Sequence, residues 1–223
     1  ILSVRDQNQG VSGEQSAWRK TRAIDVAGDG EMVDVLGDTV LEIDSDGQVV
    51  WSWSSFDHLD TTRFPSDLSN KQAKGNTGRD WTHANSLNYR ASDDSILISL
   101  RSQHWVVKIS RETGEVLWRL GEGGDFTLTE GNWFYAQHDA AWSDDTLTLY
   151  DNGSERPGPD VSYSRGVRYA IDEDGMTARL VQSFQTESYN YTYMPIVFDT
   201  EDNLLRTLEA LNNDDIYPRR YFY

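Results

Sequence analysis

The sequence predicts an all-β fold, and three observations support this prediction. Short runs rich in β-branched and apolar residues are separated by turn residues, as in Ser95–Leu100, Trp105–Ile109 and Glu115–Trp118. Aromatic residues are plentiful, with 8 Trp and 11 Tyr, which is typical of sheets whose side chains pair across strands. Helical periodicity is weak and confined to Ser12–Lys20 and Asn203–Leu211.

A strand–turn–strand unit recurs along the chain and refines this prediction. Its copies are Val40–Trp51, Val106–Trp118, Arg168–Val181 and a degraded fourth, Ile196–Leu205, each with an acidic or glycine-containing turn. Such a unit matches the outer hairpin of a β-propeller blade. We therefore expect residues 1–223 to form a single, partial β-propeller domain with about four blades or part-blades, each of about four strands.

So few blades would leave an open ring, and Ile1–Val4 is interpreted as the end of a strand that has lost its partners. We therefore expect a further segment, another chain or a homo-oligomer to complete the propeller. Polar insertions separate the repeats, and irregular loops of this kind are where function tends to be placed. They are Leu59–Arg79, Glu122–Trp133 and Gly153–Ser162.

The overall charge limits the classes of partner. A formal net charge of −17 argues against nucleic acid or an anionic membrane and favours a well-hydrated acidic surface. The chain has no cysteine, hence no disulfide or thiol chemistry, and no apolar run long enough to span a membrane. Neither a metal nor a cofactor is expected. The glycosylation triplets at Asn152 and Asn190 carry little weight, because such triplets often occur by chance.

The four histidines differ in their sequence context. His58 precedes a long loop and is expected at the surface, and His104 begins a strand and is expected to be structural. His83 and His138 precede apolar strands at matching positions in successive repeats, so a propeller would bring their imidazoles together near its axis. Two unrelated histidines with ordinary hydrogen bonds remain the alternative.

Several motifs resemble those of the bacterial and archaeal aryl-sulfate sulfotransferases, and they occur in the same order along the chain as in that family. The similarity runs from about Asp34 to Phe184, and the matching pieces are Asp80–Ser86, Asp93–Arg101, Gly114–Gly121, Gln137–Trp142, Leu149–Gly153 and Tyr163–Arg165. The resemblance implies a six-bladed β-propeller in the periplasm or outside the cell. It also implies transfer of a sulfuryl group from a phenolic sulfate to another phenol through a sulfated histidine, without a nucleotide donor.

The resemblance also assigns roles to residues. His138 matches the histidine that becomes sulfated, and His83 and Asn85 match a pair that binds sulfate and bridging oxygens. Arg101 matches the arginine that holds the sulfuryl group. A further histidine of the family has no match here and is expected upstream of Ile1; the family's disulfide cysteines are absent, and the residues that follow Arg101 differ.

The chemistry of these residue types agrees with the resemblance. A neutral imidazole is a competent nucleophile near neutral pH, and a second, protonated imidazole can donate to a departing phenolate. An arginine fork can hold two non-bridging oxygens, and an asparagine adds a neutral donor. Trp133, Phe134 and Tyr135 precede His138 and are the candidates for a wall against the substrate ring. Arg156 and Arg165 are interpreted as ordinary salt-bridge residues rather than as supports of the site.

Two other functions remain open at this point. A propeller that only binds or assembles partners has the same fold, because fold does not dictate function. The repeats also resemble those of quinone-dependent dehydrogenase propellers, although no cofactor or metal ligands of that class are found. The sequence leaves the physiological donor and acceptor undefined.

Overall fold

The structure is a computed structural model that describes residues 2–3, 19–25, 30, 32–65, 79–143, 145–158 and 163–185. These residues form three β-sheets, with only the short helix α1 (Ser55–His58) and a single 3₁₀ turn, η3 (Arg101–Gln103), beside them. The predicted all-β class is therefore confirmed. The fourth hairpin at Ile196–Leu205, the weak helix at Asn203–Leu211 and the triplet at Asn190 lie outside the described residues.

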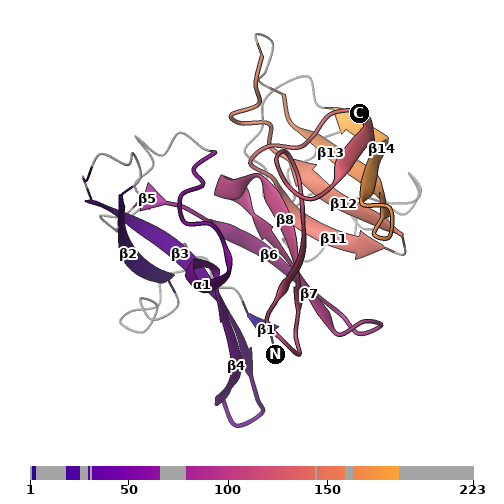
Figure 1. The fold of residues 1–223 in the computed structure, drawn as a ribbon. Helices are drawn as coiled ribbons and strands as arrows, with labels where there is room; N and C mark the ends of the chain where they lie inside the picture. Colours follow the sequence, from indigo (N-terminus) through magenta and orange to yellow (C-terminus); the bar gives the residue numbers. More distant parts are fainter. Residues whose placement is uncertain are drawn as a thin grey trace, which may run out of the picture.

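The first sheet is organised around one long strand, β3 (Met32–Ile43). The first half of β3 pairs with β2 (Arg19–Asp25) and its second half pairs with β4 (Val49–Ser54), both antiparallel. Two very short strands complete this sheet: β1 (Leu2–Ser3) is antiparallel to β3 and β5 (Arg79–Asp80) is parallel to it. The hairpin of β3 and β4 extends away from the other two sheets (Figure 1).

The second sheet is a simple antiparallel meander in chain order. It consists of β6 (Ala84–Arg90), β7 (Ser95–Leu100), β8 (Trp105–Ser110) and β9 (Val116–Leu120). This sheet lies between the other two in the ribbon view (Figure 1). Its position explains why β7, with the sequence Ser-Ile-Leu-Ile-Ser-Leu, is buried along its whole length.

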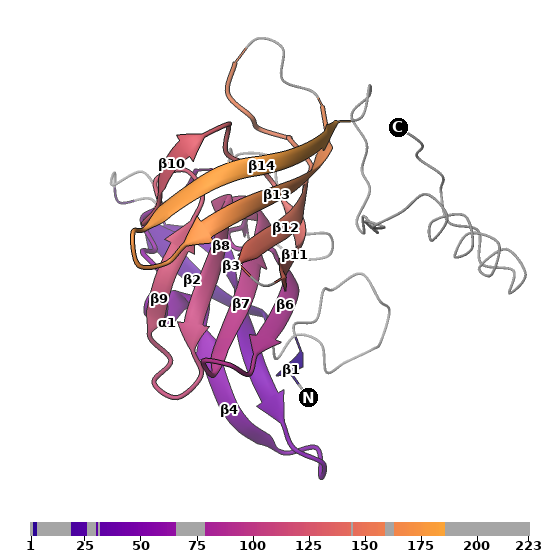
Figure 2. The ribbon, with the colours of Figure 1, turned by 90° about the vertical axis from the view of Figure 1, so that its right-hand side faces the viewer.

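The third sheet repeats the meander with β11 (His138–Ser143), β12 (Thr146–Asp151), β13 (Arg165–Asp172) and β14 (Thr177–Gln185). A fifth strand, β10 (Thr127–Glu130), runs parallel to β14 at its outer edge (Figure 2). This strand lies inside the Glu122–Trp133 segment, which is predicted from the sequence to be an irregular insertion; that prediction is wrong for Thr127–Glu130. The pairing of β10 with a strand so distant in sequence is a tertiary effect.

The three hairpins predicted within the described residues are confirmed by the strand registers. They join β3 to β4, β8 to β9 and β13 to β14. In the first turn, Asp44 accepts hydrogen bonds from the backbone of Asp46 and Gln48, and Gly47 has φ +80°, which favours glycine. That the three sheets are blades of a propeller, in one domain over residues 1–223, stays a prediction.

Apolar side chains from the three sheets form two clusters among the described residues. Alternate residues of β7 supply both, because successive side chains of a strand point to opposite faces. Ile96 and Ile98 enter the cluster shared with the first sheet, whereas Leu97 enters the cluster shared with the third sheet. Each such side chain contributes about 1.5–3 kcal/mol when fully buried, so the second sheet anchors both neighbours.

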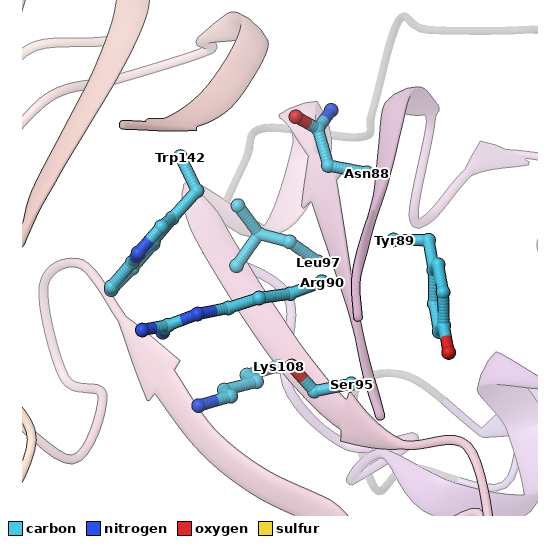
Figure 3. Close-up of a pocket in the computed structure, with 7 residues that line it drawn as sticks. All are labelled: Asn88, Tyr89, Arg90, Ser95, Leu97, Lys108 and Trp142. Carbon is cyan, nitrogen blue, oxygen red and sulfur yellow. The ribbon is translucent and has the colours of Figure 1, made fainter. Parts of the chain in front are cut away.

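Ionic contacts also join the second and third sheets. The buried Lys108 ammonium and the Arg90 guanidinium, both on the second sheet, lie 2.5 and 2.9 Å from Glu173 of the third sheet. Lys108 also lies 2.7 Å from Asp93 of its own sheet. The Arg90 guanidinium lies 4.6 Å from the centre of the Trp142 ring. A hollow of about 140 Å³ beside these groups (Figure 3) is lined by Asn88, Tyr89, Arg90, Ser95, Leu97, Lys108 and Trp142.

The insertion after α1 is attached to the second sheet through one arginine. The guanidinium of Arg63 donates to the backbone and side-chain oxygens of Gln103 at 2.7 and 2.9 Å, and it lies 3.6 Å from the centre of the Trp105 ring. Burial lowers the pKa of Arg63 to about 10, so it stays cationic at neutral pH. Among the described residues, no helix is long and apolar enough to cross a membrane.

Candidate functional site

The segment that carries His83 is fixed first by the first sheet. Strand β5 pairs with β3 immediately before it, and the Trp81 backbone N–H donates to the Leu36 carbonyl at 3.1 Å. The Trp81 ring is fully buried and stacks on Phe56 at 5.2 Å between ring centres. This packing determines where the chain enters the site.

A buried carboxylate on β3 holds the residues on both sides of His83. Asp38 accepts a hydrogen bond from the Thr82 hydroxyl at 2.7 Å and another from the Ala84 backbone N–H at 2.7 Å. The Thr82 hydroxyl also accepts from the Asp38 backbone N–H at 3.0 Å. Because these bonds are buried, breaking any of them would leave an unpaired polar group, which makes the arrangement rigid.

The second sheet holds the same segment from the other side. The backbone N–H of Arg101 donates to the His83 carbonyl at 3.1 Å, and the backbone N–H of Ser102 donates to the Thr82 carbonyl at 3.2 Å. His83 itself has φ +50°, a left-handed conformation that costs a residue with a side chain about 1 kcal/mol. The bonds from both sheets offset this cost, and the strain places the imidazole at the junction of the sheets.

His138, the first residue of β11, is placed by its neighbour Gln137. The Gln137 side chain is completely buried, and its Nε2 group lies within hydrogen-bond distance of Ser99 Oγ at 3.1 Å and of the carbonyls of Leu100 and Trp105 at 3.2 and 2.9 Å. One amide thus ties the start of β11 to both central strands of the second sheet. The residue after His138, Asp139, has φ +53° within an irregular pairing of β11 and β12.

The first strand of the second sheet, β6, is joined to the first strand of the third sheet, β11, by polar side chains. Ser86 on β6 accepts from the Ala140 backbone N–H at 2.9 Å, and Asn88 donates to the Ala140 carbonyl at 3.2 Å. Asn85 donates to the Gln137 carbonyl at 2.7 Å. These bonds hold β6 against β11 and therefore hold His83 close to His138.

The two imidazoles meet edge to face. Their ring centres are 6.0 Å apart and the ring planes are inclined by 75°. His83 Nδ1 is bonded to the carboxylate of Asp80 at 2.5 Å, whereas His138 Nδ1 is bonded to the amide oxygen of Asn152 at 2.7 Å. Since Asn152 accepts through its oxygen, His138 carries its proton on Nδ1 and its lone pair on Nε2.

The environment keeps His138 neutral. Burial is the main cause that lowers its pKa to about 4, and the nearby His83 and Arg101 lower it further. The Asn152 hydrogen bond and the Ala136 backbone act in the opposite direction but do not compensate. An imidazole with this pKa is unprotonated at neutral pH, which is the state required of a nucleophile.

The other predicted polar residues surround this pair. Arg101 starts η3 directly after β7, its Nη2 lies 3.5 Å from the Ser154 hydroxyl, and its charge acts on His138. Asn85 Oδ1 is buried without a hydrogen-bond partner among the described residues. His83 thus lies beside His138, Asn85 bonds to the residue before His138, and Arg101 is near enough for its charge to act on His138.

The three predicted aromatic residues separate in the structure. Phe134 is completely buried in the core shared by the second and third sheets, so it has no surface to offer a substrate. Trp133 stacks on Tyr169 and, with Tyr135, lines a hollow of about 430 Å³. The Tyr135 hydroxyl donates to Glu122 at 2.8 Å, and burial, the main cause, raises its pKa well above the usual range. Tyr163, Arg156 and Leu128 are among the other residues that line this hollow.

The remaining histidines have other partners, in agreement with their expected structural and surface positions. His104 is buried with φ +54°; its Nδ1 accepts from the Ala136 backbone N–H at 2.9 Å, and its Nε2 lies 3.5 Å from Glu155. His58 is exposed and stacks on Trp53 at 5.2 Å between ring centres.

Arg156 and Arg165 form ion pairs, as predicted, but these pairs also support the site, which the prediction did not favour. Both donate to one oxygen of the fully buried Asp151 carboxylate, at 2.8 and 2.7 Å. The other oxygen of Asp151 accepts from the backbone N–H groups of Tyr135 and Gly153 at 2.9 and 3.0 Å. This cluster holds the loop that carries Asn152, so it supports the position of His138 indirectly.

Three residues that shape this site have no role predicted from the sequence: Asp80, Gln137 and Asn152. All three belong to the motifs that carry the resemblance, and Asn152 also begins a glycosylation triplet. The structure gives Asn152 a different environment: it is almost fully buried and bonded to His138. The spacing of Asp80 three residues before His83 is the one local signal that suggests a bonded pair. Within the described residues, no group of three or more His, Asp or Glu side chains is arranged to hold a metal ion.

Comparison with known proteins supports the resemblance drawn from the motifs. The family model described as "Arylsulfotransferase (ASST)" matches residues 14–204. Among curated proteins, the arylsulfate sulfotransferase AssT of Escherichia coli O6:H1 (strain CFT073) is 33% identical over 234 residues. The protein of the same name from Lelliottia amnigena is 28% identical over 229 residues. Both matches cover 75% of this chain but only 38% of the relative.

Proposed function

This chain belongs to the arylsulfotransferase family, and from that premise we propose that the protein is an enzyme that transfers a sulfuryl group from an aryl sulfate ester to an acceptor phenol. The proposal includes a covalent intermediate on His138 and requires no nucleotide donor. The observation that carries it is the pair of imidazoles, 6.0 Å apart, whose Nδ1 atoms are bonded to different kinds of acceptor.

In the first half-reaction, His138 Nε2 attacks the sulfur atom of the aryl sulfate. The N–S bond forms while the bond between sulfur and the aryl oxygen breaks, and that electron pair goes to the departing oxygen. A proton on His83 Nε2 passes to this oxygen and the phenol leaves. The proton on His138 Nδ1 stays in place, and its hydrogen bond to the Asn152 amide oxygen is kept throughout.

In the second half-reaction, the acceptor phenol occupies the position that the first phenol has left. Its proton passes to His83 Nε2 as its oxygen attacks sulfur, and the N–S electron pair returns to His138 Nε2. The sulfated ring is a good leaving group, because it keeps its Nδ1 proton and is therefore positively charged until the bond breaks. The two half-reactions restore the starting protonation of both histidines.

We propose that the sulfuryl oxygens are held by the Arg101 guanidinium and by the second N–H of the Asn85 amide, whose first N–H donates to the Gln137 carbonyl. The Arg101 guanidinium has only a 3.5 Å contact with Ser154 among the hydrogen bonds of its side chain to described residues, so most of its donors remain for an anion. Sulfuryl transfer resembles phosphoryl transfer in that positioning and charge stabilisation do most of the catalytic work. A local cation is needed here because the protein as a whole has a charge of −17.

For the aromatic ring of the substrate, we propose the hollow lined by Trp133 and Tyr135. Its volume of about 430 Å³ is enough for a monocyclic phenol, and two of its walls are aromatic. The loop that bounds this hollow at Arg156 also carries Asn152 and Ser154, which contact His138 and Arg101. A periplasmic or extracellular location is proposed on the resemblance to the family alone.

The test is detection of the intermediate. The protein is incubated with 4-nitrophenyl sulfate and no acceptor, quenched at high pH, and digested for mass spectrometry. Release of nitrophenol with added SO₃ on the peptide that carries His138 is the expected result. The His138→Ala variant should lose the label, and His58→Gln, which removes an exposed histidine, should keep it.

Two outcomes would contradict the proposal. A folded protein that releases nitrophenol but carries the label on another residue would refute the assignment of His138. A protein that releases no phenol from any aryl sulfate would instead support the alternative of a non-catalytic binding module.

A further inference from the structure

We infer that Asp80 and Asn152 are positioning residues that give the two histidines opposite tasks: Asp80 makes His83 the proton carrier, and Asn152 makes His138 the nucleophile. The inference rests on the proposed function and deepens it, because it explains why one imidazole attacks sulfur and the other does not. The evidence is the difference between the two acceptors behind the rings, a carboxylate and an amide.

Asp80 is placed to orient and charge His83. Its carboxylate is nearly buried and lies 2.5 Å from His83 Nδ1, and strand β5 fixes its backbone against β3. An ionised carboxylate only accepts hydrogen bonds, so the bonded Nδ1 carries a proton. Proton exchange with a substrate then falls to Nε2, and the Asp80 carboxylate places a negative charge directly behind the ring.

Asn152 is placed to orient His138 without charging it. Its amide oxygen lies 2.7 Å from His138 Nδ1, and its own carbonyl accepts a hydrogen bond from Ser164 at 2.9 Å. The next residue, Gly153, has φ +71°, and a Cβ atom there would lie 2.1 Å from the Tyr163 carbonyl oxygen, so the turn is fixed by glycine. A neutral acceptor selects the tautomer but adds no charge that would hold a second proton.

The surroundings of each ring agree with this division. His138 is buried beside two groups that can be positive, His83 and Arg101, and its Nδ1 is bonded to the neutral amide of Asn152. The His83 side chain is more exposed, at 28%, and has a carboxylate partner. An exchange of the two acceptors would therefore exchange the tasks, whereas a merely structural tie would tolerate either acceptor.

The first test varies the leaving group in the complete protein. Asp80→Asn keeps the shape and removes the charge behind His83. Because a nitrophenolate leaves without help but an unsubstituted phenolate needs a proton, the burst of phenol released from 4-nitrophenyl sulfate without acceptor should slow by only a few-fold in Asp80→Asn. The corresponding burst from phenyl sulfate should slow by about 10²-fold or more. Equal losses for both donors would overturn the role of Asp80, because a misplaced site would slow both alike.

The second test changes the acceptor behind the nucleophile. Asn152→Asp keeps a hydrogen-bond acceptor and adds a negative charge, so protonated His138 should persist to higher pH. The acid limb of the nitrophenol burst should then move upward by at least one pH unit, while the burst at high pH returns close to that of the unchanged protein. An unmoved acid limb would overturn the role of Asn152.

A third measurement requires no turnover. Long-range ¹H–¹⁵N spectra of protein with ¹⁵N-labelled histidine report which ring nitrogen carries the proton, and the chain has only four histidines. We expect Nδ1 to be protonated in both His83 and His138, and Asn152→Leu to release His138 to the more common Nε2 tautomer. An Nε2–H tautomer for His138 in the unchanged protein would overturn the inference.

These measurements separate the inference from the proposed function. An unchanged protein that transfers from no aryl sulfate would refute the proposed function, while the spectra would still decide the tautomers. An active protein in which Asp80→Asn loses both donors equally would refute the inference and leave the function standing.

Discussion

Protonation of His138 should cost this protein part of its stability in mild acid, and His138→Gln should remove that cost. Burial is the main cause that lowers the pKa of His138 from 6.5 to about 4 in the folded chain, whereas the unfolded chain has the ordinary value. Between these values the unfolded state binds more protons than the folded state. Stability is therefore full above pH 6.5 and decreases as the pH falls toward 4.

The magnitude follows from the same two values. The interval from 6.5 to about 4, at about 1.4 kcal/mol for each pH unit, gives about 3 kcal/mol of unfolding free energy lost through this one group. Glutamine does not bind a proton in this pH range, so the His138→Gln variant should not lose this part of the unfolding free energy. Any constant cost of the substitution cancels, because only the change with pH is compared.

Urea unfolding followed by tryptophan fluorescence at pH 7.5 and pH 4.5 measures the difference. We expect the unchanged protein to lose about 2–3 kcal/mol more than His138→Gln between these two conditions. His58→Gln, which removes an exposed ring stacked on Trp53, serves as the control for the loss of one histidine. A difference below about 1 kcal/mol, or one that favours the unchanged protein at low pH, would refute the argument from burial.

Three further substitutions test other parts of the structure. Glu173→Gln removes the charge that faces buried Lys108, so urea titration should show an unfolding free energy lower by about 2–3 kcal/mol. In the same assay, Glu112→Gln, at an exposed position, should change it little. Gln137→Leu leaves buried acceptors of the second sheet unpaired and should cost about 1–3 kcal/mol in the same assay; an effect no larger than that of exposed Gln48→Leu would count against the anchoring role. Arg101→Lys keeps the charge but loses the fork, so turnover of 4-nitrophenyl sulfate should fall roughly 10- to 100-fold, and an unchanged rate would remove Arg101 from the proposed sulfuryl site.

The sequence predicts the outer hairpins well because their information is local. Val106–Trp118, for example, contains two β-branched runs and a Thr-Gly turn, and the structure pairs them as β8 and β9. The turn glycine, Gly114, has φ +75°, which a residue with a side chain adopts only with strain. Residues near each other in sequence fix these elements, so a pattern search finds them.

The first strands of the second and third sheets, β6 and β11, are harder to predict, because their sequences are suited to contacts with a neighbouring sheet. Strand β6 contains Ser86 and Asn88 where an alternating apolar pattern would be expected. Both side chains bond to the backbone of Ala140 on β11, so their polarity serves packing between sheets rather than exposure to water. No single-strand pattern predicts such a contact. The parallel pairings of β5 with β3 and of β10 with β14 escape prediction for the same reason.

The candidate site lies at this junction, and its position explains which of its residues could be predicted. His83 and His138 have recognisable positions in the repeat, and this repetition is the sequence signal that suggests their proximity. Asp80 and Asn152 act on them through bonds that depend on how two left-handed or irregular segments are held by Asp38, on the first sheet, and by the buried Asp151. The reactive side chains are thus set by the repeated part of the fold. The positions of their protons are set by the irregular segments that carry Asp80 and Asn152. That one imidazole is bonded to a carboxylate and the other to an amide is therefore visible only in the structure.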